Sequence, residues 1–103
     1  MLDFEFRTPV AFFIFNRPEN TERVFREIAR VKPAILLIVG DGPRENHSED
    51  KLKVKLTREI ITKIDWPCDL RTNFSEINLG CKIRVSSGLD WVFKEVELSL
   101  IHI

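Results

Sequence analysis

The sequence has no excess charge of either sign and no long apolar run. Lysine plus arginine number 16, aspartate plus glutamate also number 16, and the two signs are mixed along the chain. This balance argues against a basic nucleic-acid-binding surface and against an acidic solvating tail, so we expect no nucleic-acid partner. The longest apolar runs, Val10–Phe15 and Ala34–Val39, are far shorter than the roughly 20 residues that a membrane-spanning helix needs. We therefore expect no transmembrane segment.

Cysteine is also scarce. Cys68 and Cys81 do not form a C-x-x-C pair, and two thiols cannot make a disulfide framework. Residues 1–5 lack the basic region of a secretory signal peptide. Reduced thiols and no leader are typical of a cytoplasmic protein. The 103 residues suffice for one small domain.

Several catalytic and cofactor-binding motifs are missing. The chain contains no G-x-G-x-x-G, no G-x-x-x-x-G-K-[ST], no H-E-x-x-H and no G-x-S-x-G. This disfavours nicotinamide-type dinucleotide binding, P-loop chemistry, zinc-protease chemistry and the serine-hydrolase elbow. His47 and His102 are isolated in the sequence, and an isolated histidine is more often a solvated side chain than a ligand.

The chain alternates between apolar strand patterns and helical periodicity. Two continuous apolar runs and one run of alternating polarity predict three strands, at Val10–Phe15, Ala34–Val39 and Cys68–Phe74. Helical spacing predicts three helices, over 19–31, 50–64 and 82–96. The alternation of the third strand places it near a sheet edge. The order β-α-β-α-β-α predicts a Rossmann-like, doubly wound α/β fold, in which helices cover both faces of a mainly parallel sheet.

Each predicted helix has an apolar stripe that we expect to face the sheet. The three stripes are Val24, Phe25, Ile28 and Ala29; then Leu52, Leu56, Ile60 and Ile64; then Val85, Leu89, Val92 and Val96. At the start of the first helix, Asn16-x-x-Glu19 has the form of a capping box, and Pro18 suits a first turn.

Three clusters follow the predicted strands, where ligands bind in doubly wound sheets. The first is Asn16-Arg17-Pro18, of which Arg17 is not explained by a helix cap. The second is Asp41, a hydrogen-bond acceptor for a ribose or base, or equally a turn residue. The third is Asn78–Gly80, followed by Lys82 and Arg84 at a helix start, where a phosphate could bind or Gly80 could simply allow a turn.

Taken together, these clusters resemble the start of a GT-A glycosyltransferase domain of the bacterial family-2-like sugar transferases. The segments that carry the resemblance are Thr8–Pro18, Asp41–Arg44, Asn78–Cys81, Val85–Gly88 and Asp90–Trp91, within residues 8–97. The resemblance implies transfer of a sugar from a nucleoside-diphosphate donor to an acceptor hydroxyl in the cytoplasm. In a longer parent protein it is also compatible with a place at the membrane surface.

The resemblance also implies roles for particular residues. The residues expected to line the base and ribose are Phe15, Asn16, Arg17, Pro18 and Glu19. Asp41 would accept a hydrogen bond from the base or ribose. Those expected near the base or diphosphate are Gly80, Lys82 and Arg84. A divalent metal, Mn²⁺ or Mg²⁺, is expected for the full-length parent.

The sequence departs from the family where its metal-binding acidic motif should follow the third helix. After Glu97 the chain reads Leu98–Ile103 (LSLIHI) and contains no such acidic cluster. This string resembles a translated sequencing adapter, which would make residues 98–103 foreign to the natural protein, although their alternation could also form a fourth strand. We thus expect residues 1–103 to be one partial domain that holds no metal, has no catalytic base and is inactive alone.

Two other functions share the same strand and helix pattern. A non-catalytic α/β module could use its strand-exit loops to bind a nucleotide or a partner protein without any further chain. A receiver-like regulatory domain would need paired carboxylates after the first strand, where this chain has Asn16-Arg17. We therefore rank the receiver-like domain below the other two.

Overall fold

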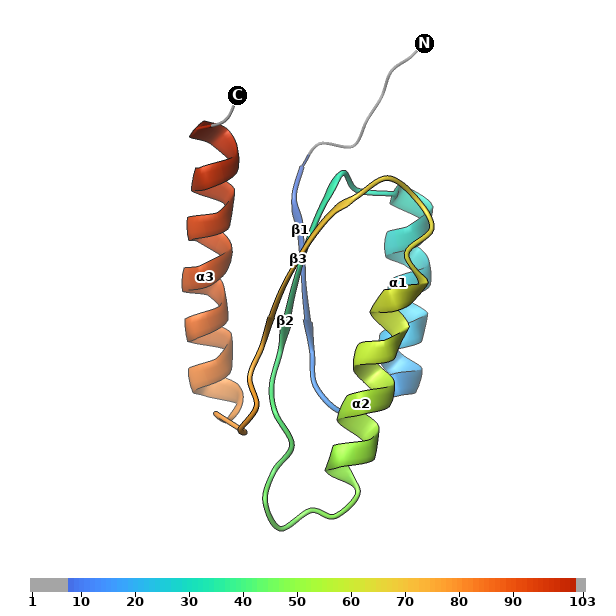
Figure 1. Ribbon diagram of the computed structural model, residues 1–103, viewed down its shortest axis with the longest axis vertical. Coiled ribbons are helices and arrows are strands. Elements are labelled where there is room, and N and C mark those ends of the chain that lie inside the picture. The colour runs from blue at the N-terminus through green and yellow to red at the C-terminus, as the bar shows by residue number, and fades with distance from the viewer. Residues whose placement is uncertain (1–7, 102–103) are drawn as a thin grey trace.

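A three-stranded parallel sheet forms the centre of the computed structural model, which describes residues 8–101 (Figure 1). The strands β1 (Val10–Ile14), β2 (Ile35–Gly40) and β3 (Asp69–Phe74) lie in the order β1-β2-β3. Ile14 pairs with Gly40 across one ladder, and Gly40 with Phe74 across the other. The four central side chains of β2, from Leu36 to Val39, are at most 1% exposed. Burial on both faces of the sheet explains why the sequence of β2 is an unbroken apolar run.

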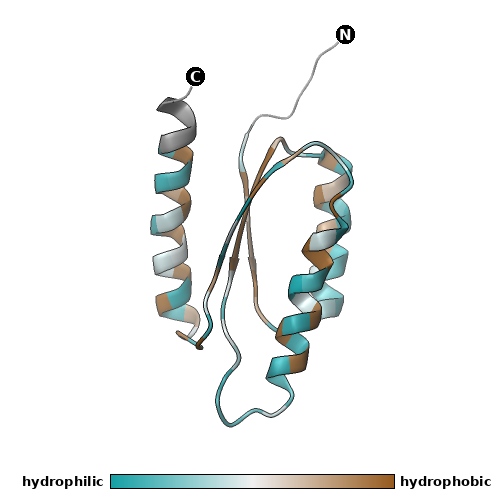
Figure 2. Cartoon of the chain, in the orientation of Figure 1, coloured by the Kyte–Doolittle hydropathy of each residue, from teal (hydrophilic) through white to brown (hydrophobic). Residues whose placement is uncertain are grey.

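Helices cover both faces of this sheet. Helices α1 (Pro18–Val31) and α2 (Asp50–Ile60), with the short 3-10 turn η1 (Ile61–Lys63), lie on one face, whereas α3 (Cys81–Ile101) lies on the other (Figure 1). Figure 2 shows apolar residues concentrated in β1 and β2 and polar residues along the connection from β2 to α2. The predicted α/β class, with its parallel sheet, is confirmed.

Each face of the sheet has its own core. Under α1 and α2, Phe25 packs against Trp66 with ring centroids 5.9 Å apart, and the Trp66 indole N–H donates to the Pro33 carbonyl at 3.0 Å. Under α3, Leu37 and Val39 pack against Val92. The first core is the larger because two helices and η1 contribute to it.

The connections between the strands run in one direction. Crossovers are right-handed, so α1 and α2 carry the chain across the sheet from β1 to β3 on one face. Helix α3 lies on the other face. Because the three strands are parallel, their carboxyl ends lie at the same end of the sheet, and β1 has a free edge within residues 8–101.

Three predictions about the helices are wrong. Asn16 and Glu19 form no capping box, because Arg17 is the N-cap residue of α1 without a side-chain cap, and the Asn16 amide bonds to Asp50 instead. Leu52 and Leu56 are 61% and 41% exposed, because α2 buries Val54, Thr57 and Ile60. Residues 98–101 continue α3 rather than forming a fourth strand, and residues 102–103 lie outside the described part of the chain.

A fourth difference lies beside β1. The sequence predicts that Val24, Val85 and Leu89 face the sheet, but they are 47%, 41% and 41% exposed. Pro18, in contrast, occupies the first turn of α1 as predicted.

Candidate functional site

A groove of about 590 Å³ runs from the free edge of β1 to the carboxyl ends of β1 and β2. Its walls come from β1, the first half of α1, and the first turns of α3. The residues at its carboxyl-end mouth include Phe15, Asn16, Arg17, Asp41, Arg44, Asn78, Gly80, Cys81 and Arg84. The mouth of the groove thus lies at the carboxyl ends of the strands, where doubly wound sheets bind ligands.

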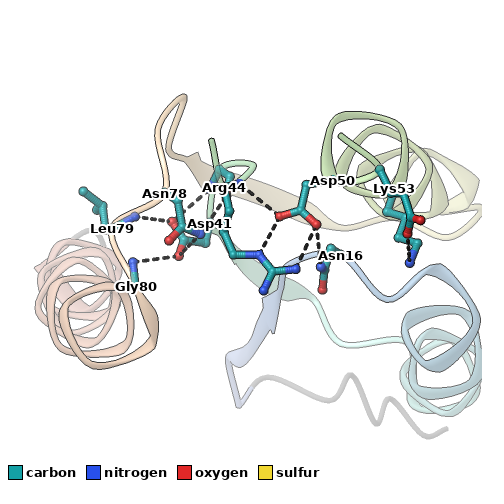
Figure 3. A network of polar contacts seen from close by, with 10 residues as sticks. Asn16, Asp41, Arg44, Asp50, Lys53, Asn78, Leu79 and Gly80 are labelled. Atoms are coloured by element: carbon teal, nitrogen blue, oxygen red, sulfur yellow. Dashed lines mark hydrogen bonds and ion pairs between the residues drawn. The ribbon is translucent and has the colours of Figure 1, made fainter. Parts of the chain in front are cut away.

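Asp41, which follows β2, joins two of the loops at this edge (Figure 3). Its Oδ1 accepts from the backbone N–H groups of Gly42 and Leu79, both at 2.9 Å. Its Oδ2 accepts from the N–H of Gly80 and the side-chain amide of Asn78, both at 3.2 Å. A carboxylate has about four acceptor positions, and all four are used here. Asp41 therefore holds the β3–α3 loop against the end of β2.

Two glycines permit this close approach of the loops. A Cβ atom on Gly42 would lie 2.6 Å from the backbone of Ile77, so no larger residue fits there without moving the loop. Gly80 has φ of +85°, which residues with a side chain rarely adopt. The sequence G-D-G-P and the later Gly80 are thus required by the geometry of the same junction.

A second network centres on Asp50, the buried first residue of α2 (Figure 3). Its carboxylate accepts from the Arg44 side chain at 2.8 and 3.1 Å and from the Arg44 backbone N–H at 3.0 Å. It also accepts from the Asn16 amide at 3.1 Å. The hydrogen bonds from Arg44 hold the pKa of Asp50 well below its usual range. The network connects the loop after β1 to the loop after β2.

Arg44 also contributes to the groove wall. Its guanidinium carbon lies 5.6 Å from the centroid of the Phe15 ring, a cation–π distance. Asp50 and Phe15 together fix the position of this arginine, and 44% of its side chain remains exposed. The mouth of the groove therefore has a positioned aromatic ring with a cation beside it.

Arg84, in contrast, is buried and forms structural hydrogen bonds within the chain. Its Nε donates to the Gly40 carbonyl at 3.2 Å, and its Nη2 donates to the carbonyl and side-chain oxygens of Asn73 at 2.6 and 2.8 Å. Its Nη1 donates to the Ser87 hydroxyl at 3.2 Å. Most of its donors therefore tie α3 to the ends of β2 and β3.

The predicted site residues divide into three groups. Those that line the groove are Phe15, Asn16, Arg17, Asp41, Gly80 and Arg84. Pro18 and Glu19 line a neighbouring depression, together with Asn16 and Arg17. Lys82 is exposed on the first turn of α3, and is not among the described residues that line the groove. The sequence predicted that Asp41 and Arg84 contact a ligand. In the structure, most of their polar side-chain atoms form hydrogen bonds within the chain instead.

The sequence analysis did not select Asp50 or Arg44 as site residues. Asp50 resembles an ordinary helix-start acid, and only its contact with Asn16, 34 positions earlier in the chain, reveals its role. Arg44 is part of the Asp41–Arg44 motif, but the sequence does not indicate that Asp50 is its partner. The amide of Asn78, which bonds both Asp41 and the Gly42 carbonyl, is likewise recognisable only in three dimensions.

Arg17 is the cation at the mouth without an internal partner. It is exposed and lines the groove, and no hydrogen bond or ion pair within residues 8–101 engages its guanidinium. The N-termini of α1 and α3 both lie at this end of the sheet, and their first backbone N–H groups are not used within the helix. Arg17 and the two helix ends give this mouth a positive potential.

The described acidic residues do not fit the metal ion that the glycosyltransferase resemblance implies. The carboxylates nearest the groove, Asp41 and Asp50, each accept four hydrogen bonds from N–H donors. Across residues 8–101, no group of three or more His, Cys, Asp or Glu side chains is arranged to hold a metal ion. Ligand binding at this groove would therefore use the side chains and backbone N–H groups of the protein itself.

No known family of protein sequences, no curated protein and no solved structure matches this chain. Among residues 8–101, no helix is long and apolar enough to cross a membrane.

Proposed function

We propose that this chain binds the nucleoside-diphosphate part of a sugar donor, as the donor-binding part of a cytoplasmic glycosyltransferase. The observation that carries the proposal is the groove at the carboxyl ends of the strands, whose mouth is lined by Arg17 and by the start of α3, and the Arg17 guanidinium has no partner within residues 8–101. Free backbone N–H groups and a guanidinium are the groups that bind phosphate oxygens best. Asn16, Asp41 and Gly80, which belong to the motifs that resemble GT-A glycosyltransferases, line this same groove.

In this proposal each part of the groove meets a different part of the ligand. The base lies against the ring of Phe15, whose position Arg44 fixes. The diphosphate accepts hydrogen bonds from Arg17 and from the first N–H groups of α1 or α3. Asp41 acts indirectly, because its carboxylate shapes the loop that carries Gly80.

The proposal limits what the 103 residues do alone. Sugar transfer needs a group that takes the proton of the acceptor hydroxyl and a charge that stabilises the leaving diphosphate. Asp41 and Asp50 are engaged as acceptors and cannot readily serve as that base. We expect the chain to bind a donor nucleotide without turning over the donor.

Calorimetric titration with uridine and guanosine diphosphates tests the proposal. We expect one of them to bind, and Arg17→Gln to weaken the affinity at least about tenfold, because one charge-assisted hydrogen bond contributes roughly 1.5–3 kcal/mol. Arg23→Gln is the matched control, since Arg23 is an exposed arginine of α1 that is not among the groove-lining residues. Absence of binding by both nucleotides, or equal weakening by both substitutions, would refute the proposal.

A further inference from the structure

Two polar side chains at the mouth of the groove are held by the same carboxylate oxygen. The side-chain amide of Asn16 and the Nη2 atom of Arg44 each donate to Oδ1 of Asp50 at 3.1 Å. Because both nitrogens lie this close to one oxygen, the two side chains are neighbours, although they belong to the loops after β1 and β2. Both residues line the groove, so Asp50 positions two of its polar side chains relative to each other.

The contacts with Asp50 also determine which polar atoms of this pair remain available. An ionised carboxylate only accepts hydrogen bonds, so the Asn16 amide turns its NH₂ group toward Asp50 and its oxygen Oδ1 away. Arg44 uses Nε and Nη2 on Asp50, and neither Asn16 Oδ1 nor Arg44 Nη1 takes part in a hydrogen bond within residues 8–101. Figure 3 shows both atoms on the side away from Asp50. The mouth therefore presents one acceptor beside one donor.

An aromatic ring lies next to this acceptor and donor. Phe15 precedes Asn16 in the chain and lines the same groove, and the Arg44 guanidinium carbon lies 5.6 Å from the centroid of its ring. Stacking on an aromatic ring is tolerant of the kind of base, because every base has a π-face. Selectivity among bases therefore depends on hydrogen bonds at the edge of the base, which would meet Asn16 and Arg44.

We propose that Asn16 and Arg44 recognise the base of the donor nucleotide at an edge where a ring N–H lies beside a carbonyl group. Oδ1 of Asn16 accepts a hydrogen bond from the ring N–H, and Nη1 of Arg44 donates one to the carbonyl oxygen. Uracil presents N3–H beside O4, and guanine presents N1–H beside O6. This inference rests on the proposed nucleotide site and identifies the residues that determine its base specificity.

This assignment differs from the role that the sequence predicted for Asp41. The Asp41 carboxylate accepts two hydrogen bonds on each oxygen from within the chain, so a base N–H would have to displace one of those donors. Asn16 Oδ1 requires no such exchange. The Asp50 carboxylate also has its acceptor positions occupied. Asp50 is thus a positioning residue, which acts through the orientation of Asn16 and Arg44 rather than by contact with a ligand.

Ring-methylated nucleotides test the acceptor. N3-methyluridine and N1-methylguanosine diphosphates keep the diphosphate, the ribose and the carbonyl, but carry a methyl group in place of the hydrogen that Asn16 would accept. Calorimetric titration of both unmodified nucleotides and both methylated forms shows which base is recognised. We expect the methylated form of the nucleotide that binds to bind at least about tenfold more weakly, because a site built to bind an N–H group rejects an analogue without it. Equal affinity of the two forms would overturn this inference and leave the diphosphate site standing.

The variant Asn16→Ala shows whether Asn16 is the residue that detects the methyl group. Without the acceptor, the methylated and unmodified nucleotides should bind with similar affinity. A difference as large as in the wild type would overturn the assignment, because the methyl group would then be rejected by another part of the groove. Asn20→Ala is the matched control and should retain the wild-type difference, since Asn20 is an exposed groove-lining asparagine that makes no hydrogen bond within the described part of the chain.

Thionucleotides test the donor in the same way. In 4-thiouridine and 6-thioguanosine diphosphates, sulfur replaces the carbonyl oxygen and is a weak acceptor. The wild-type chain should bind the thio form more weakly than the unmodified nucleotide. Arg44→Lys keeps a cation near Asp50 but has no Nη1, so it should remove this difference. Equal binding of both forms by the wild type, or an undiminished difference in Arg44→Lys, would overturn the role of Arg44.

The comparisons separate this inference from the proposed function. Circular dichroism shows whether each variant is folded, and the wild-type comparisons with methylated and thio forms require no variant. If neither unmodified nucleotide binds, the proposed nucleotide site is refuted and the base specificity with it. If a nucleotide binds but the methylated form binds equally well, only the base specificity is refuted.

Discussion

Replacement of Asp41 by asparagine should destabilise the fold strongly, although it changes only one atom. The carboxylate accepts two hydrogen bonds on each oxygen. In the variant, one oxygen becomes an NH₂ group, which faces N–H donors and cannot accept from them. Either the pair Gly42 and Leu79 or the pair Gly80 and Asn78 then loses its acceptor.

The magnitude follows from the number of donors left without a partner. An unsatisfied buried donor costs about 1–3 kcal/mol, so two of them in this partly buried junction cost about 3 kcal/mol. One kcal/mol lowers the melting temperature of a domain of this size by about 4–8 °C, which predicts a decrease of roughly 12–24 °C. This is a large part of the roughly 5–15 kcal/mol that stabilises a chain of this length.

Thermal unfolding followed by circular dichroism at neutral pH measures the effect. Asp69→Asn is the control, because Asp69 is half exposed and pairs with Arg71 on the edge strand, where an ion pair contributes at most about 1 kcal/mol. If Asp41→Asn lowered the melting temperature no more than this control does, the bracing role of Asp41 would be refuted.

Further predictions concern α3, acid stability and thiol reactivity. Gly88→Ala should lower the unfolding free energy measured in urea by about 1–3 kcal/mol, because overpacking outweighs the gain in helix propensity. The added Cβ would lie 2.7 Å from the ring of Phe13. An increase in stability would contradict this packing. The hydrogen bonds from Arg44 lower the pKa of Asp50 in the folded state. The stability that this pair contributes is therefore present above about pH 5 and is lost as the pH falls below about 4. Asp50→Asn should remove this part of the pH dependence of the unfolding free energy. Burial raises the pKa of Cys68, whereas Cys81 is exposed, so a thiol reagent at about pH 8 should modify Cys81 first. Peptide mass mapping measures the order of modification, and the reverse order would contradict the structure.

The sequence predicted the order and type of the elements because strand signals here are local. Val10–Ile14 and Ile35–Gly40 are apolar on both faces and are bounded by proline and glycine turns, which leaves few alternatives. The alternation in Asp69–Phe74 correctly indicated an edge strand. Periodicity failed for Leu52 and Leu56, since the face that a helix buries depends on where the helix lies over the sheet.

The position of the candidate site could be predicted, but the roles of its side chains could not. Strand exits in a parallel sheet meet at one edge, so Asn16, Asp41 and Gly80 were expected near one another. Whether a carboxylate is free for a ligand depends on donors from other loops. Asp41 is engaged by a loop 37–39 positions later, and the Asn16 amide by a residue 34 positions later. No local pattern contains that information.

The most direct test of nucleotide binding at the groove is a ¹H–¹⁵N NMR titration of the labelled chain with uridine and guanosine diphosphates. We expect one nucleotide to shift the backbone amide signals around Arg17, Arg44 and Gly80, with little change on the exposed face of α2. No shift with either nucleotide, or shifts confined to α2 and β3, would contradict this expectation.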